Sequence, residues 1–144
     1  MKIFVAVCFL FAVSTSAYVV KSRDEHLQFR NECIAELKVP TDLLNQYKQF
    51  QYPNDSTTQC YLKCIFVKFG FFDTTNGFSV ENIHQQLVGA AAEANHGDDL
   101  HTKISSCIDK NEQGSNACEW VYRGATCLIK NNLPLVQRSV ATQT

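Results

Sequence analysis

Apolar residues recur along most of the chain at the three- and four-residue spacing of amphipathic helices. Each run starts near a residue that caps helix N-termini and stops near a glycine or a proline. The pattern predicts four helices over residues 22–37, 41–50, 56–69 and 79–95, a fifth from residue 98 or 99 up to Gly114, and a sixth from 115 or 116 to 131. Residues 132–144 are then expected to form a short C-terminal tail after Pro134.

Polar residues at four of the starts predict how the helices are capped. Ser22 and Ser56 are each followed three residues later by Glu or Gln, which is the spacing of a capping box. Thr41 and Ser79 are single N-cap candidates. The helix over residues 56–69 is apolar on almost every side, which is typical of a buried central helix.

The connection over residues 71–78 has two interpretations. Asn76-Gly77 lies between aromatic residues, as in many β-hairpins. Ser79 fits the N-cap of the next helix, which favours a loop instead. We expect the loop and keep the hairpin as the alternative.

The N-terminus has the three parts of a secretory signal peptide. Lys2 is the positive residue, residues 3–13 are apolar, and Thr15-Ser16-Ala17 supplies small residues for cleavage. The apolar run is too short to span a bilayer. We therefore expect a signal peptide over 1–17, a single helical domain over 18–144, and a secreted, extracellular protein without stable membrane insertion.

Composition and charge exclude several classes of function. The chain of 144 residues is 45% hydrophobic and 19% charged, which is ordinary for a globular protein. Its net charge of -1 does not favour nucleic-acid binding, which needs a basic surface. The common catalytic and nucleotide-binding motifs are absent, so we expect no enzyme and no cofactor.

Seven cysteines are many for this length, and loss of Cys8 with the signal peptide leaves six. An even number in an exported chain predicts three disulfides, and oxidised thiols are not nucleophiles. Cys60 and Cys64 lie one helical turn apart, so we expect each to bond to a different partner. A metal site at this pair is the less favoured alternative, because zinc sites use closer pairs.

The six cysteines follow the spacing C-x26-C-x3-C-x42-C-x10-C-x8-C. With the signal peptide and the helical pattern, this spacing resembles the insect odorant-binding proteins of the pheromone-binding and general odorant-binding family, and the chain looks most like a fly member. The resemblance implies the pairs Cys33–Cys64, Cys60–Cys118 and Cys107–Cys127. It also implies an all-α fold, with about six helices around an apolar cavity.

For function, the resemblance implies a carrier of small hydrophobic molecules such as odorants, pheromones or fatty acids. The expected partners are the ligand and, indirectly, a membrane receptor, and the expected state is a monomer or a weak homodimer. The alternatives are a signalling protein that acts through a protein partner, and a solid helical bundle that binds nothing.

The expected ligand contacts come from three sources, and core packing without ligand contact is the alternative for each. The resemblance points to Leu62, Phe66, Phe71, Ile104, Val121, Ala125 and Leu128. Ile83, Leu87 and Ala91 form a stripe that can supply another wall, and the tail can contribute Leu133, Leu135 and Val136. Tyr47 and Tyr122 can offer hydroxyl groups to a ligand, although buried tyrosines often bond to the backbone.

The chain has four histidines: His26, His84, His96 and His101. The resemblance allows the first and last of them to face the pocket, but we expect exposed positions and no metal site. Protonation of histidines or opening of the tail is a hypothesis for pH-dependent ligand release.

Overall fold

The computed structural model describes residues 17–89 and 99–141, and it confirms the predicted all-α class. Within these residues there are seven helices and one short antiparallel hairpin. In chain order the elements are α1 (Arg23–Leu37), α2 (Thr41–Lys48), α3 (Ser56–Lys68), β1 (Phe72–Asp73), β2 (Gly77–Phe78), α4 (Val80–Val88), α5 (Asp99–Ser106), α6 (Ala117–Asn131) and α7 (Leu133–Ala141).

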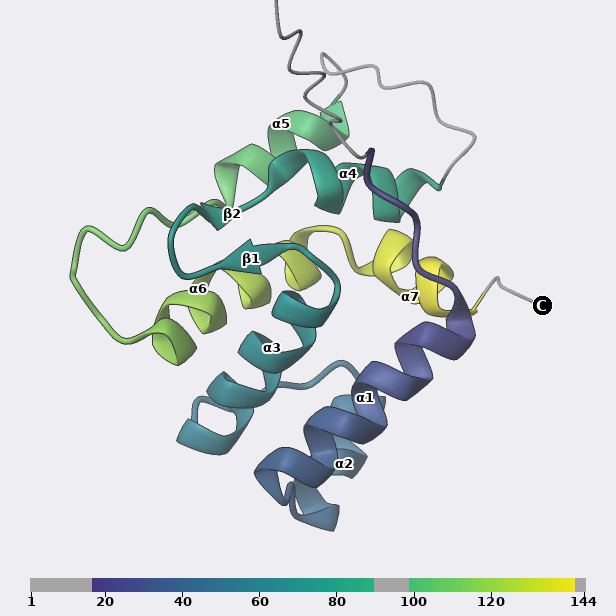
Figure 1. Cartoon of the computed structure of the whole chain (residues 1–144), viewed down its shortest axis with the longest axis vertical. Helices are drawn as coiled ribbons and strands as arrows, with labels where there is room; N and C mark the ends of the chain where they lie inside the picture. The colour runs from purple at the N-terminus through teal and green to yellow at the C-terminus, as the bar shows by residue number, and fades with distance from the viewer. Residues whose placement is uncertain (1–16, 90–98, 142–144) are drawn as a thin grey trace, which may run out of the picture.

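Helix α3 lies at the centre of the molecule, packed between α1 and α6 (Figure 1). Helices α4 and α5 pack against each other at one end, and α7 lies between α4 and α1. Residues 17–22 run past α4 as an extended segment before α1 begins. We call this segment the N-terminal strap.

Two of the predicted helix caps are present, and two are wrong by one residue. Ser22 and Glu25 form the predicted capping box, and Ser79 accepts a hydrogen bond from the backbone N–H of Asn82. Helix α3 is capped by Asp55 instead of Ser56, because the Asp55 carboxylate accepts from both the backbone N–H and the hydroxyl of Thr58. The N-cap of α2 is likewise the residue before Thr41, and it forms no side-chain bond.

Residues 71–78 form the hairpin that was the less favoured alternative. Phe72 pairs with Phe78 across the two strands. Asp73 accepts hydrogen bonds from the backbone N–H groups of Thr75 and Asn76, and Gly77 has a φ of 78°. The expected loop is therefore wrong, and Ser79 begins the next helix directly after the hairpin.

Three helices end before the predicted residues, because α2 ends at Lys48 and not residue 50, α5 ends at Ser106 and not near Gly114, and α4 is also shorter. Helix α4 ends at Val88, since Gly89 has a φ of 83° and leaves the helix, whereas the pattern predicted helix to residue 95. Residues 90–98, which include Ala91 and His96, lie outside the described residues. The expected tail contains α7, with Pro134 in its first turn, where a proline loses no helical hydrogen bond.

Three disulfides cross-link the helices, with the pairs that the resemblance implied. Cys33–Cys64 joins α1 to α3, Cys60–Cys118 joins α3 to α6, and Cys107–Cys127 joins the end of α5 to α6. Helix α6 also approaches the hairpin closely at Gly124, where a Cβ atom would lie 2.5 Å from the Phe78 ring. This contact explains a glycine inside a long helix, where it otherwise lowers stability.

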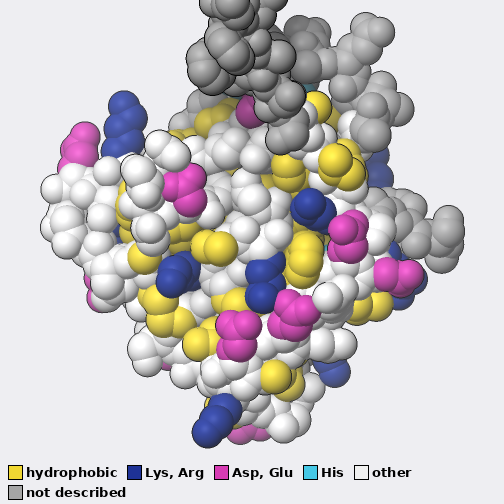
Figure 2. Space-filling model, viewed as in Figure 1, with side chains coloured by type: hydrophobic (Ala, Val, Ile, Leu, Met, Phe, Trp, Pro, Cys, Tyr) yellow, Lys and Arg dark blue, Asp and Glu magenta, His cyan; other side chains and the backbone are white. Residues whose placement is uncertain are grey.

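The surface carries charges of both signs. On the face shown in Figure 2, lysine and arginine side chains alternate with aspartate and glutamate, and hydrophobic side chains lie among them. Lys68 pairs with Glu32 at 2.8 Å, and Arg123 pairs with Asp109 at 2.7 Å. In the described part of the chain, every helix is too short or too polar to cross a membrane.

Candidate ligand-binding cavity

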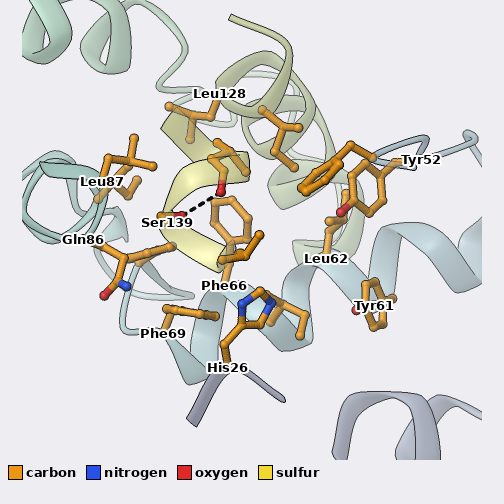
Figure 3. Close-up of a pocket in the computed structure, with 17 residues that line it drawn as sticks. His26, Tyr52, Tyr61, Leu62, Phe66, Phe69, Gln86, Leu87, Leu128 and Ser139 are labelled. Carbon is orange, nitrogen blue, oxygen red and sulfur yellow. Dashed lines mark hydrogen bonds between the residues drawn. The ribbon is translucent and has the colours of Figure 1, made fainter. Parts of the chain in front are cut away.

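An apolar cavity of about 120 Å³ lies between the central helices and the α4–α7 side of the molecule (Figure 3). Five of the seven helices and the α2–α3 connection contribute side chains, and most of them are hydrophobic or aromatic. The lining residues are His26, Phe50, Tyr52, Tyr61, Leu62, Ile65, Phe66, Phe69, Phe71, Ile83, Gln86, Leu87, Leu128, Ile129, Val136, Ser139 and Val140.

Seven of the expected ligand-contact residues line this cavity, and ligand contact by them stays a prediction. They are Leu62, Phe66, Phe71, Ile83, Leu87, Leu128 and Val136. Seven others among the described residues do not line it: Tyr47, Ile104, Val121, Tyr122, Ala125, Leu133 and Leu135. Thus the structure brings together the expected residues of α3 and α4, but only the last one of α6.

Three of the expected residues outside the cavity belong to the solid core. Ile104, Val121 and Ala125 are each 0% exposed and pack among other buried side chains. Val121, Ala125 and Leu128 follow one another on a single face of α6, but the cavity reaches only the final turn of that helix. In this structure Val121 and Ala125 therefore fit the alternative interpretation, core packing without ligand contact.

The two expected hydroxyl donors have partners within the protein. The Tyr122 hydroxyl donates to the backbone carbonyl oxygen of Tyr52 at 2.8 Å, and the Tyr47 hydroxyl lies 2.7 Å from Thr58 Oγ1. Tyr122 therefore supports the cavity indirectly, because it holds the segment that carries Tyr52. Leu135 of α7 does not line the cavity, whereas its neighbour Val136 does.

Aromatic rings form much of the wall. Phe71 contacts Phe66 edge-on at 5.5 Å and stacks on Phe69 at 5.0 Å between ring centroids. On the α2 side, the Tyr47 ring stacks on both Tyr52 and Tyr61. Such contacts fix the shape of the wall, because several of these rings, Phe69 and Phe71 among them, contact more than one other ring.

The lining residues of the α2–α3 connection and most of those on α7 were not predicted from the sequence. Phe50 is the last residue of the helix predicted over 41–50, but α2 ends at Lys48, so both Phe50 and Tyr52 lie in the connection, where helical spacing assigns no face. Phe50 also adopts a left-handed backbone conformation, with a φ of 57°, which the sequence does not indicate at a phenylalanine. The two aromatic residues just before Pro53 were the one available indication of an apolar contact.

Two histidines differ from the expected exposed positions. His26 is half-buried, lines the cavity and contacts the Phe69 ring edge-on at 5.4 Å. His84 is 1% exposed on α4 and lies 6.0 Å from His101 between ring centroids. Burial lowers the pKa of His26, and the positive charge of Arg30 lowers it further.

Gln86 connects the cavity wall to the N-terminal strap. Its side-chain oxygen accepts hydrogen bonds from the Tyr18 hydroxyl at 2.9 Å and the Lys21 backbone N–H at 2.8 Å. Its side-chain nitrogen donates to the Lys21 carbonyl oxygen at 3.1 Å. One buried amide therefore fastens the strap across α4 and satisfies its own hydrogen-bonding groups.

The cavity has the shape and polarity of a binding site for a small apolar molecule. Its few polar groups belong to the imidazole of His26, the amide of Gln86 and the hydroxyls of Tyr52, Tyr61 and Ser139. The described residues contain no group of three potential metal ligands, and the six cysteines among them are disulfide-bonded. Ligand sites of this kind are mostly apolar, with a few polar groups that orient the ligand.

A comparison with known families shows where this architecture belongs. A profile of the PBP/GOBP family matches residues 15–131. The chain belongs to the PBP/GOBP family. General odorant-binding protein 99a of Drosophila melanogaster is 56% identical to it over 141 residues, which cover 98% of each chain. Odorant-binding protein 22 of Aedes aegypti is 38% identical over 140 residues, which cover 97% of this chain and 98% of that protein.

Solved structures of the family share the fold at much lower identity. An odorant-binding protein of Locusta migratoria superposes with a TM-score of 0.61 at 24% identity, over 89% of this chain and 97% of that one. An Anopheles gambiae odorant-binding protein with bound cyclohexanone gives a TM-score of 0.62 at 16% identity, over 81% and 99%. These likenesses confirm the fold that the cysteine spacing implied for this PBP/GOBP chain.

Proposed function

We propose that this chain is an extracellular carrier of small hydrophobic molecules, which it binds in the cavity between α3, α4, α6 and α7. The observation that supports the proposal is a mostly apolar, aromatic-walled cavity inside a member of the PBP/GOBP family. Relatives at 56% and 38% identity are named odorant-binding proteins. The proposal requires no catalytic step and no cofactor.

Secretion is part of the proposal. Residues 1–17 act as a signal peptide, and the protein that functions begins at Tyr18 as a monomer or a weak dimer. Three disulfides support an oxidising, extracellular location. In that fluid, the carrier delivers its ligand to a membrane receptor without itself entering the membrane.

Binding is driven by removal of apolar ligand surface from water, which contributes roughly 25 cal/mol for each Å² buried. A cavity of about 120 Å³ is close in size to apolar cavities that hold one benzene-sized ring. Small cyclic or short-chain molecules therefore fit without rearrangement. Longer ligands require α7 or the adjoining hollow beside α1 to provide more space.

The test is to fill the cavity with a side chain and measure ligand uptake. Val136 is half-buried and lines the cavity from α7, whereas the next residue, Gln137, is exposed. We expect Val136→Trp to weaken binding of the fluorescent apolar probe N-phenyl-1-naphthylamine at least about tenfold, a loss of about 1.4 kcal/mol. Gln137→Trp is the matched control and should leave binding unchanged.

Native mass spectrometry of the secreted protein, before and after delipidation, gives an independent result. Co-purified small apolar molecules that disappear on delipidation and return on titration support the carrier function. A ligand-free protein that takes up no apolar probe contradicts it.

A further inference from the structure

The turn before α3 contains the one Asn-x-Ser/Thr sequence of the chain, Asn54-Asp55-Ser56. In an exported protein such a sequence can accept an N-linked glycan on its asparagine. The same residue types also occur in turns that carry no glycan, because their side chains hydrogen-bond to nearby backbone groups. The two cases differ in what each of the three side chains does in the folded protein.

Asp55, the middle residue, has the structural role that the sequence predicted for Ser56. Its carboxylate accepts hydrogen bonds from the backbone N–H and the hydroxyl of Thr58, which makes it the N-cap of α3. Gln59, the second member of the predicted capping box, donates instead to the side-chain oxygen of Asn54 at 2.7 Å. The hydroxyl of Ser56 is therefore not needed to begin the helix.

The two outer residues of the sequence, Asn54 and Ser56, are the ones that define a glycan acceptor, and both are exposed. Among residues 17–89 and 99–141, no group accepts a hydrogen bond from Asn54 Nδ2, the atom to which a glycan is attached. The Ser56 hydroxyl likewise forms no hydrogen bond within that part of the chain. Neither side chain is thus occupied by the turn or by the helix.

The turn also places Asn54 away from the ligand. The Asp55 backbone N–H donates to the Pro53 carbonyl oxygen at 3.0 Å, and Tyr122 fixes the carbonyl group of Tyr52. Residues 54–56 line neither the apolar cavity nor the hollow of about 260 Å³ that adjoins it beside α1 and α2. A bulky, hydrophilic group on Asn54 can therefore extend into solvent while Tyr52 keeps its place in the cavity wall.

We propose that Asn54 carries an N-linked glycan in the secreted protein. This inference rests on the secretion that is part of the proposed function, because the modification belongs to exported chains. In the transfer, Asn54 Nδ2 attacks the anomeric carbon of an oligosaccharide that is joined to a lipid through pyrophosphate. A carbon–nitrogen bond forms as the bond from that carbon to the phosphate oxygen breaks. The lipid pyrophosphate leaves with the electron pair of the broken bond, and the amide nitrogen loses one proton.

Two substitutions separate the glycan from the helix cap. Ser56→Ala destroys the acceptor sequence but keeps the cap, so it should lose the glycan and unfold at the same urea concentration as the enzymatically deglycosylated parent. Asp55→Ala keeps an Asn-x-Ser sequence but removes the cap, so it should keep the glycan and unfold at a lower urea concentration than the parent. Asn45 is an exposed asparagine of α2 outside any acceptor sequence, which makes Asn45→Gln the matched control for Asn54→Gln.

The experiment is expression of the full chain in insect cells and analysis of the protein in the medium. A peptide-N-glycosidase should increase the gel mobility of the parent, Asn45→Gln and Asp55→Ala, and should leave Asn54→Gln and Ser56→Ala unchanged. In the treated parent, mass spectrometry of the reduced tryptic peptide over residues 49–63 should show aspartate in place of Asn54. Affinity for N-phenyl-1-naphthylamine should change less than about twofold on treatment, because the glycan lies outside the cavity.

The possible failures are distinct. A secreted parent whose peptide over 49–63 carries no glycan would overturn the inference and leave secretion and the carrier function standing. A glycosidase-sensitive mobility that persists in Asn54→Gln would place the glycan elsewhere and would also overturn it. If the parent is absent from the medium and stays unglycosylated in the cells, the proposed secretion and the inference are both wrong.

Discussion

On one side of the cavity, α3 and α6 are joined by Cys60–Cys118, and each of them has a second disulfide to a neighbouring segment. On the other side, α4 and α7 contain no cysteine, and α4 is fastened to the N-terminal strap by the hydrogen bonds of Gln86. We call these sides the cross-linked wall (α3 and α6) and the free wall (α4 and α7). The same cavity thus has one covalently fixed boundary and one held by reversible contacts.

The difference indicates where ligand enters and leaves. Segments without cross-links open at a lower free energy than the rest of a domain, and sites that must admit a ligand use such segments. The free wall supplies three α4 residues (Ile83, Gln86 and Leu87) and three α7 residues to the cavity, so its displacement opens the site directly. The cross-linked wall preserves the aromatic surface against which the ligand packs.

The largest expected effect comes from removing the bond at the centre of the cross-linked wall. Cys60→Ala with Cys118→Ala should lower the free energy of unfolding by about 4 kcal/mol, because this disulfide closes a segment with a sequence separation of 58. Cys107→Ala with Cys127→Ala, at a separation of 20, should lower it by about 3 kcal/mol. Urea unfolding followed by circular dichroism measures both.

Native-state hydrogen exchange of the parent protein tests the comparison itself. The free energy of the openings through which amides exchange should be lower in α7 than in α3 and α6. Loss of Cys60–Cys118 should make this difference in opening free energy smaller. Equal protection of α7 and of α3 and α6 in the parent would show that the free wall does not open more readily than the cross-linked wall.

An intermediate effect is expected at the link between the strap and the free wall. Gln86→Ala removes three hydrogen bonds, so it should lower the free energy of unfolding by about 2–3 kcal/mol and increase the rate of ligand dissociation. The control is Gln85→Ala on the same helix, since the Gln85 side chain has no hydrogen-bond partner in the described part of the chain. Equal losses in the two variants would show that the strap does not stabilise this wall.

The smallest effect concerns pH. Because burial and Arg30 lower the pKa of His26 from its usual 6.5, the folded protein binds a proton there less readily than the unfolded chain. The folded state therefore loses stability as pH falls from about 6.5 toward the lower folded pKa. His26→Gln should make unfolding free energy less dependent on pH between about 5 and 7.

The measurement is urea unfolding of the parent and of His26→Gln across this pH range. His101→Gln changes a histidine on α5 that does not line the cavity, and it serves as the control. A parent and a His26→Gln variant with the same pH dependence would show that His26 does not sense pH in this protein.

Most helices could be predicted because their starts and faces are encoded locally. The Ser22 capping box and the Ser79 cap are short-range hydrogen bonds, so a few residues suffice to identify them. The error at Ser56 arose because Asp55, one residue earlier, is an equally good cap and also binds Thr58. Helix α7 was missed because Pro134 indicates the end of a helix as readily as the beginning of one.

The cavity was harder to predict than the fold. Val121 and Leu128 lie on the same face of α6, yet one is core and the other lines the cavity. The difference depends on where α3, α6 and α7 diverge, which is a property of how the helices cross and not of any one helix. Phe50 and His26 also line the cavity. Whether they face it depends on how α1 and the α2–α3 connection pack against the other helices, which local sequence does not show.

The order of the disulfides has a consequence for the protein in a fluid that contains proteases. The spans between bonded cysteines, 33–64, 60–118 and 107–127, overlap without a gap. A single cut of the backbone anywhere from Cys33 to Cys127 therefore leaves both fragments covalently attached. Only the ends can be released by one cut, and the C-terminal end carries α7, a wall of the cavity. A protease that cuts between Cys127 and α7 would thus remove one wall of the cavity and release the ligand. The cross-linked part of the protein would stay intact.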